Sequence, residues 1–214
     1  MGGVDVGEVR LAILRVARAL EAHKGRLTEL DQAMGDGDLG ITAGKMAAAL
    51  AAYAADEPAT TDVGTFLAQA GVAVNRAASS SLGTLLATAA MRAGKEVRGR
   101  SEIAAADLAR MLQAADAGIQ ERGKAKPGDK TIIDVVHPAA EAFAEALAED
   151  AQVPEAAARM LAAARAGRDA VTPLRSKIGR AGWIGERTEG RVDPGCEAGV
   201  AILEAIAGTN EEDA

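Results

Sequence analysis

The sequence contains few aromatic residues, one cysteine and two histidines. Aromatic side chains make up 2% of the 214 residues and the net charge is −7, whereas a nucleic-acid-binding surface needs basic side chains and stacking rings. Because Cys196 is alone, the chain has no internal disulfide and no multi-cysteine zinc or iron–sulfur site. With His23 and His137 as the only imidazoles, a metal site would be built from oxygen ligands and would suit Mg²⁺ or Ca²⁺.

The sequence also lacks long apolar runs. No window reaches the roughly 18 uninterrupted apolar residues of a membrane span, and the first residues, "MGGVDVGEVR", are acidic rather than apolar. Together with the single cysteine, this pattern predicts a cytoplasmic protein without a membrane partner. The net charge and the low aromatic content predict that no nucleic acid is a partner. Hydrophobic residues make up 49% of the chain, enough for an ordinary core. We expect one domain over residues 1–214, with a frayed acidic tail at 209–214.

Helix-forming residues are abundant instead. Alanine, leucine, glutamate and arginine dominate, and no stretch of about four to eight residues alternates as a strand would, which predicts an all-α fold. Asp62, Ser101 and Pro154 are helix start signals, and Gly94 and Gly208 are stop signals. The expected helices are 6–23, 27–34, 42–55, 62–77, 82–93, 102–122, 131–149, 155–171 and 196–207.

Two segments, 123–131 and 172–195, interrupt this pattern and show no helical stripe. A loop as long as the second one is usually functional or disordered, and its apolar residues favour order. Within it, Trp183 is expected to be a packing anchor. His137, which precedes Pro138, is expected to be a core or kink residue, and Cys196 a structural one.

The stretch "AMGDGDLGITAGK", residues 33–45, looks like a phosphate-binding loop but matches none of the known types. Its glycines spell G-x-G-x-x-G, yet helical residues precede them where a dinucleotide fold needs a strand. A P-loop is excluded because Leu39 stands where the first glycine belongs and Met46 replaces the serine or threonine. An EF-hand is excluded because Ile41 occupies the obligatory glycine position.

Three aspartates remain: Asp31, Asp36 and Asp38. Residues five apart on a continuous helix point about 140° away from each other, so the glycines between them are what would let Asp31 meet the other two. Three converging carboxylates need a divalent cation, and that cation would in turn accept polyphosphate oxygens. Alternatively, Asp31 caps a helix and the other two are solvated turn residues. Spacing alone leaves both interpretations open.

The segment "LTELDQAMGDGDLG" resembles the metal-binding segment of the nucleotide-binding L subunit, or DAK2 domain, of dihydroxyacetone kinases. The resemblance continues, in the same order, in "SSSLGTLLATAAMRAG", "GKAKPGDKTIIDVVHPA" and "KIGRAGWIGERTEGRVDPG". It implies a closed, barrel-like bundle of about eight antiparallel helices with the nucleotide site at one end. It also implies that two Mg²⁺ ions join the nucleotide phosphates to the three aspartates.

Matched by position, the resemblance implies the site residues as well. The metal ligands would be Asp31, Asp36 and Asp38, and Arg180 would be the catalytic residue that balances charge on the transferred phosphoryl group. The nucleotide-binding residues would be Leu39, Gly40, Ile41, Thr42, Ser79, Ser80, Ser81, Gly123, Thr131, Ile132, Arg180, Asp193, Pro194 and Gly195. On the residues alone, the three serines are more typical of a helix cap, which is compatible with phosphate binding at the same helix start.

The sequence departs from the family pattern in two of these blocks. Family members usually have a histidine after the third aspartate and an asparagine at or near two residues beyond the next glycine, whereas this segment has Leu39, Ile41 and Thr42. The serine block usually begins with two glycines and contains another, whereas this chain has Ala77, Ala78 and Ser81. The metal ligands are unchanged, whereas the phosphate contacts differ.

The implied activity is phosphoryl transfer to dihydroxyacetone or a related short keto-sugar. The chain would present Mg-ATP, or a tightly held ADP that is itself rephosphorylated, to sugar bound by a separate K-type subunit. The donor would be free ATP or a phosphocarrier protein, since both versions share the metal loop. Two alternatives stay open: an ADP-loaded module that binds a transcription regulator, and a kinase subunit for another acceptor such as a tetrulose.

Overall fold

The computed structural model describes residues 3–209, apart from the side chain of Arg180. Of the acidic tail expected to fray, residues 210–214 lie outside the described part of the chain. Within that part the fold is all-α, as the composition predicts. The helices are α1 (Val6–Ala22), α2 (Lys24–Met34), α3 (Leu39–Tyr53), α4 (Val63–Ala77), α5 (Ser81–Glu96), α6 (Ala105–Gly123), α7 (Ile133–Ala148), α8 (Val153–Val171), α9 (Gly179–Ile184) and α10 (Pro194–Ala207).

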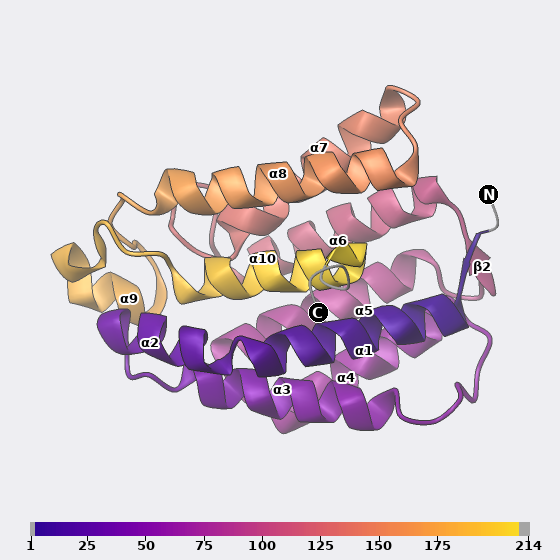
Figure 1. Ribbon diagram of the computed structural model, residues 1–214, viewed down its shortest axis with the longest axis horizontal. Coiled ribbons are helices and arrows are strands. Elements are labelled where there is room, and N and C mark those ends of the chain that lie inside the picture. Colours follow the sequence, from indigo (N-terminus) through magenta and orange to yellow (C-terminus); the bar gives the residue numbers. More distant parts are fainter. Residues whose placement is uncertain (1–2, 210–214) are drawn as a thin grey trace.

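Eight of these helices close into a ring. Each packs against the next in the order α1, α3, α4, α5, α6, α7, α8, α10, and α10 packs against α1 again. Consecutive helices of the ring run in opposite directions (Figure 1), and α2 extends α1 beyond His23. The expected closed bundle of about eight antiparallel helices is therefore confirmed for residues 3–209.

Small residues let neighbouring helices approach closely. A Cβ on Gly64 of α4 would lie 2.3 Å from the carbonyl oxygen of Gly94 in α5, and a Cβ on Gly94 would lie 2.5 Å from that of Gly64. Gly94 was expected to end its helix; instead it lies inside α5, which continues to Glu96. Its role is packing, because only a residue without a side chain fits where two helix backbones meet.

Two of the helix boundaries predicted from capping residues agree with the structure. The Asp62 side chain accepts a hydrogen bond from the Thr65 N–H, as its position predicts, and Gly208 ends α10 at φ +77°. The expected start at Ser101 is wrong. Residues 102–103 form strand β2 (Glu102–Ile103), which pairs antiparallel with β1 (Val4–Asp5), and α6 begins at Ala105.

The long segment 172–195 contains more helix than its sequence predicts. It holds α9 and a 3-10 turn, Gly185–Thr188, before α10 begins. Short helices of this kind have no room for the periodic apolar stripe on which a sequence-based prediction depends.

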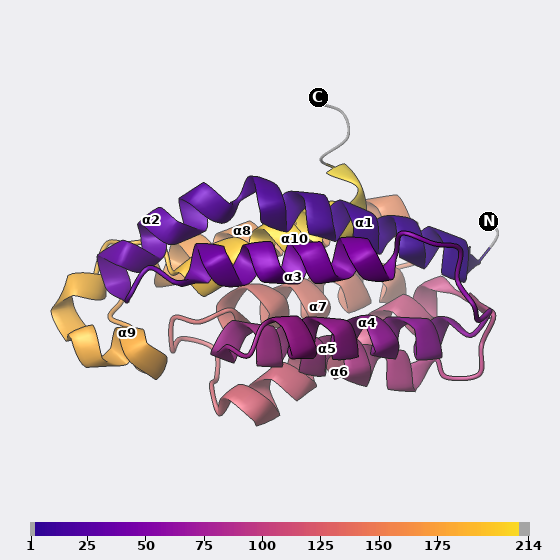
Figure 2. The same cartoon turned by 90° about the horizontal axis from the view of Figure 1, so that it is seen from below.

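Alternation of helix direction gathers the connections at the two ends of the barrel. The α2–α3, α4–α5, α6–α7 and α8–α10 connections all lie at the end that carries α9 (Figures 1 and 2). The β1–β2 pair lies at the other end. All four sequence blocks that resemble the DAK2 pattern therefore reach one end of the molecule. Residues 3–209 include no helix with the length and apolar character needed to cross a membrane.

Candidate metal and nucleotide site

The turn between α2 and α3 folds tightly back on the end of α2. A Cβ on Gly35 would lie 2.6 Å from Asp31 Oδ1, and Gly37 has φ +76°, a conformation that favours glycine. The N–H of Leu39, the first residue of α3, donates to Asp31 Oδ2 at 3.0 Å. The glycines thus permit the close return that the spacing of the aspartates requires.

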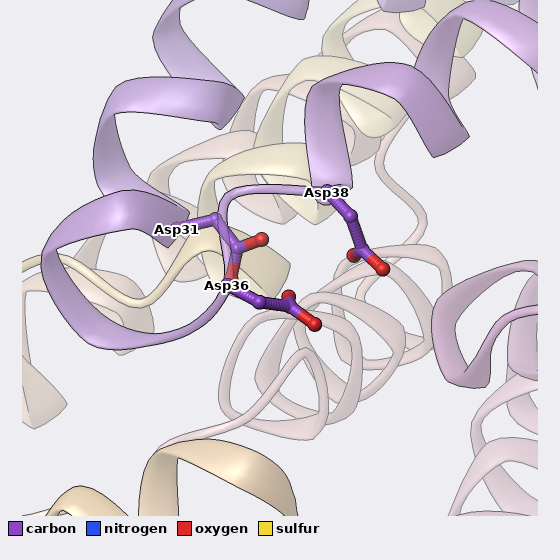
Figure 3. A group of neighbouring side chains, drawn as sticks. All are labelled: Asp31, Asp36 and Asp38. Atoms are coloured by element: carbon purple, nitrogen blue, oxygen red, sulfur yellow. The ribbon is translucent and has the colours of Figure 1, made fainter.

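The three aspartates converge. One carboxylate oxygen from each of Asp31, Asp36 and Asp38 lies within 4.8 Å of the other two, and Figure 3 shows Asp31 projecting from the last turn of α2 and the other two from the segment that leads into α3. Among residues 3–209, no other group of three acidic, histidine or cysteine side chains comes this close. Asp31 also caps the start of α3, so the two interpretations of the sequence are compatible for this residue.

The donor set fits a hard divalent cation. Oxygens bound to one ion are at most about 4.2 Å apart around Mg²⁺ and about 5 Å apart around Ca²⁺, and the three carboxylate oxygens lie within 4.8 Å of one another. Three like charges at this spacing repel each other, and a cation between them removes that repulsion. Asp36 and Asp38 are exposed, so an ion and its remaining ligands can reach them from solvent.

A cavity of about 760 Å³ opens at the same end of the barrel. Six of the expected nucleotide residues line it: Ser79, Ser80, Ser81, Gly123, Thr131 and Ile132. They come from the α4–α5 and α6–α7 connections and the adjoining helix ends, and more than 40 residues of sequence separate the three serines from the other three residues. Its lining also includes Asn75, Thr84, Leu85, Ile119, Arg122, Ala125, Ile133, Ile178 and Gly179, which the sequence did not indicate.

Two of these unexpected residues had a detectable signal. Thr84 lies four residues after Ser80, which places it one turn later on the same face of α5, and Arg122 directly precedes Gly123. Ile178 and Gly179 belong to a block that resembles the DAK2 pattern, but their place in the lining depends on how the 172–195 segment folds back, which helical periodicity does not indicate.

The start of α5 faces this cavity. Ser80 is the N-cap residue, and its Oγ accepts from the Gly83 N–H at 3.0 Å, which confirms the expected cap. The first turn of a helix presents N–H groups without intrahelical acceptors, together with the positive end of the helix dipole. An anionic group in the cavity would be stabilised there.

The expected phosphate-facing residues 39–42 are not among those that line the cavity. They form the first turn of α3 beside the aspartates, where Ile41 is 62% exposed and Thr42 is buried. Gly40 lies against α2, since a Cβ there would be 2.4 Å from the carbonyl oxygen of Lys24. Close packing against α2 explains why residue 40 is a glycine.

Asp193, Pro194 and Gly195 also lie outside the lining and begin α10. The buried Asp193 accepts from the Cys196 N–H at 2.9 Å. Burial raises the pKa of Asp193 to about 6, while the hydrogen bonds from the start of α10 and the charge of Lys130 oppose the shift. A Cβ on Gly195 would lie 3.6 Å from the Ile132 nitrogen, so this turn supports the cavity wall from behind.

Three other expectations concern single side chains. Cys196 is buried, its Sγ donates to the Thr131 carbonyl at 3.0 Å, and burial raises the pKa of the thiol, in line with a structural role. Trp183 is 93% exposed, so the expected packing anchor is wrong. Arg180 belongs to α9, and its side chain lies outside the described part of the structure.

His137 was expected to be a core or kink residue; it is not in the core, and α7 continues through the adjacent Pro138. Its ring lies between α6 and α7 with Nδ1 2.8 Å from Asp116 Oδ2, and its side chain is 30% exposed. The hydrogen bond with Asp116 raises the pKa of His137 above its ordinary value, while partial burial opposes that shift. This pair links two helices and lies outside the cavity lining.

Comparison with known proteins finds relatives that are named as kinases or kinase subunits. It is 32% identical over 189 residues to the PEP-dependent dihydroxyacetone kinase 2, ADP-binding subunit DhaL, of Listeria innocua, covering 87% of each chain. It is 29% identical to the triokinase/FMN cyclase of Mus musculus, covering 96% of this chain and 35% of that protein.

The fold leads to the same group. The crystal structure of the dihydroxyacetone kinase of C. freundii (native form) superposes with a TM-score of 0.73 at 26% identity, covering 94% of this chain and 34% of that one. The chain spans about a third of these two longer relatives. The DAK2 domain matches residues 33–208, which contain two of the three converging aspartates and all the lining residues of the cavity. The chain therefore belongs to the DAK2 domain family.

Proposed function

We propose that this chain is the nucleotide-binding subunit of a kinase for dihydroxyacetone or a related short keto-sugar, with residues 1–214 as one nucleotide-binding domain. The observation that carries the proposal is the convergence of three carboxylates within 4.8 Å at the barrel end that also holds the cavity. The names of the relatives, an ADP-binding subunit and dihydroxyacetone kinases, support the same activity.

The metal ligands proposed are Asp31, Asp36 and Asp38, for two Mg²⁺ ions. Without cations these carboxylates would repel a polyphosphate. When bound, Mg²⁺ neutralises charge on the phosphate oxygens and joins them to the protein. The aspartates themselves fix where that charge is held, because their turn is anchored by the Leu39 N–H.

For the nucleotide, the cavity supplies position rather than chemistry. Ser79, Ser80 and Ser81 at the start of α5 provide hydroxyl and N–H donors for phosphate oxygens, and Gly123, Thr131 and Ile132 flank the nucleoside. Residues 39–42 contribute through the backbone of the first turn of α3, and residues 193–195 through support of Ile132. Arg180 is proposed to balance charge on the transferred phosphoryl group.

The sugar is proposed to be held by a separate K-type subunit in the cytoplasm. All ring helices of residues 3–209 belong to one barrel, and the cavity of about 760 Å³ is assigned to the nucleotide. Alignment of the acceptor hydroxyl with the γ-phosphate can supply roughly 7 to 11 kcal/mol of barrier reduction, and a triose needs its own binding site for that. The relative named as PEP-dependent and ADP-binding favours retained ADP that a phosphocarrier protein rephosphorylates, rather than free ATP.

Reconstitution tests this function. The purified chain with Mg²⁺ should bind ADP in calorimetry and should phosphorylate dihydroxyacetone only after a K-type subunit and a donor are added. Parallel reactions with ATP or a phosphocarrier system, and with dihydroxyacetone or a tetrulose, identify donor and acceptor. Steady turnover by the isolated chain would refute the subunit assignment. ADP-dependent capture of a transcription regulator without any kinase activity would favour the regulatory alternative.

A further inference from the structure

Lys130 is a fully buried lysine with an unusual set of partners. It is 1% exposed, and its Nζ donates to the carbonyl oxygens of Thr172 and Leu174, both at 2.8 Å, and of Thr188 at 2.6 Å. Its backbone has φ +62°, a region that residues other than glycine seldom occupy. Its ammonium group thus spends all three donors on a single distant segment, 172–188.

The buried ammonium group of Lys130 therefore depends on segment 172–188 for its hydrogen-bond acceptors. Burial lowers the pKa of Lys130, and the nearby charge of Asp193 partly offsets the effect. A buried ammonium is tolerated when its donors are satisfied and is costly when they are not. Displacement of segment 172–188 would leave a charged group without acceptors, so Lys130 favours one placement of the segment.

The other side of Lys130 is the cavity wall. The next two residues, Thr131 and Ile132, line the cavity. The preceding Asp129 accepts a backbone hydrogen bond from the Lys177 N–H at 3.1 Å, and its Oδ1 lies 3.6 Å from Lys177 Nζ. Asp129 and Lys130, which are consecutive residues, thus both bind segment 172–188.

Segment 172–188 in turn reaches the cavity. Ile178 and Gly179, directly after Lys177, belong to the lining. Within the segment, Thr188 Oγ1 accepts from the Ser176 N–H at 3.0 Å and donates to the Gly185 carbonyl at 2.7 Å. These bonds make the segment a unit, so its placement by Lys130 also places Ile178 and Gly179.

We propose that Lys130 is a positioning residue for the nucleotide: it contacts the covering segment 172–188 and not the ligand, and it keeps that segment over the cavity. The inference rests on the proposed function, since it takes Mg-nucleotide as the occupant. Its consequence is kinetic, because a segment that covers a bound ligand must move before the ligand leaves. Loss of the hydrogen bonds from Lys130 to this segment should speed nucleotide release much more than it changes the rate of nucleotide association.

The test compares Lys130→Met with Lys126→Met in the full chain. Met has a similar length without donors or charge, and Lys126 is an exposed lysine of the same connection. Stopped-flow measurement with fluorescent ADP and Mg²⁺ should show release about tenfold faster or more in the Lys130 variant, the size expected for losing charge-assisted hydrogen bonds. Association should change by less than about threefold. The Lys126 variant should behave as the wild type does.

Hydrogen exchange separates positioning from general stability. In Lys130→Met, protection should fall within 172–188 and persist in the ring helices. Release at the wild-type rate, with the segment deprotected, would overturn the proposal. So would uniform loss of protection together with unchanged release. Failure of the wild type and the Lys126 variant to bind Mg-ADP would instead refute the proposed function.

A second variant decides the matter if Lys130→Met does not fold. Thr188→Val keeps the carbonyl that Lys130 contacts and removes the hydroxyl that bonds Ser176 and Gly185. It should loosen the segment while leaving the lysine satisfied, and should also speed ADP release. A deprotected segment with wild-type release in this variant would overturn the proposal equally.

Discussion

Asp36→Asn tests the metal site with little change of shape. Asp36 is exposed in the turn after α2, so the loss of one carboxylate charge should cost little folding free energy. At a separation of 4.8 Å or less, two unit charges repel by about 0.9 kcal/mol or more in the dielectric of water. Asp36 faces two such partners. We therefore expect the metal-free variant to be as stable as the wild type, or more stable by about 2 kcal/mol, with a smaller gain in high salt.

Binding should change in the opposite direction. With one of three anionic ligands gone, we expect the Kd for ADP in the presence of Mg²⁺ to rise about 100-fold or more, which corresponds to about 2.7 kcal/mol. Calorimetry measures this Kd, and thermal unfolding with and without Mg-ADP measures the same linkage independently. The wild-type melting temperature should rise on addition of Mg-ADP, and that of the variant should not.

Asp56→Asn is a matched control, because Asp56 is an exposed aspartate in the α3–α4 connection at the other end of the barrel. It should leave both measurements unchanged. Undiminished Mg-ADP affinity in Asp36→Asn would refute the three-aspartate site. A loss of more than about 1 kcal/mol in the metal-free variant would show that Asp36 serves the fold instead.

Three further predictions concern other parts of the molecule. Because the pKa of His137 is raised, its pair with Asp116 contributes fully to stability below the unfolded pKa of about 6.5 and loses that contribution as pH rises through the folded pKa. In urea unfolding, the stability of His137→Gln should therefore fall less than that of the wild type between about pH 6 and about 8. An equal fall in both proteins would contradict this. Ser80→Ala should lower stability by about 1 kcal/mol through loss of the cap to Gly83, and should also weaken Mg-ADP binding; a loss of stability without any loss of affinity would show that the hydroxyl only caps. Residues 172–195 should gain hydrogen-exchange protection when Mg-ADP binds, and equal protection in both states would indicate a purely structural segment.

Much of the helical framework could be predicted because its signals are local. Helix propensity and caps act within about four residues, so Asp62 and Gly208 mark the starts and ends that the structure shows. The predicted helix end at Gly94 and helix start at Ser101 are wrong because contacts between elements distant in sequence decide these two positions. Helix packing across the ring explains the first, and pairing of β1 with β2 overrides the second.

The candidate site divides in the same way. The sequence by itself indicated that the three aspartates could converge and that a serine caps the helix after residue 80. Each of these features depends on one short segment, the first on glycine-broken spacing and the second on a capping residue. Only the tertiary structure decided that distant blocks share one cavity, since the alternating helix directions of a closed ring bring their connections to one end. It also decided that Lys130 is buried and Trp183 exposed. Burial of those side chains depends on how segment 172–188 folds back over the barrel, which no interaction between sequence neighbours specifies.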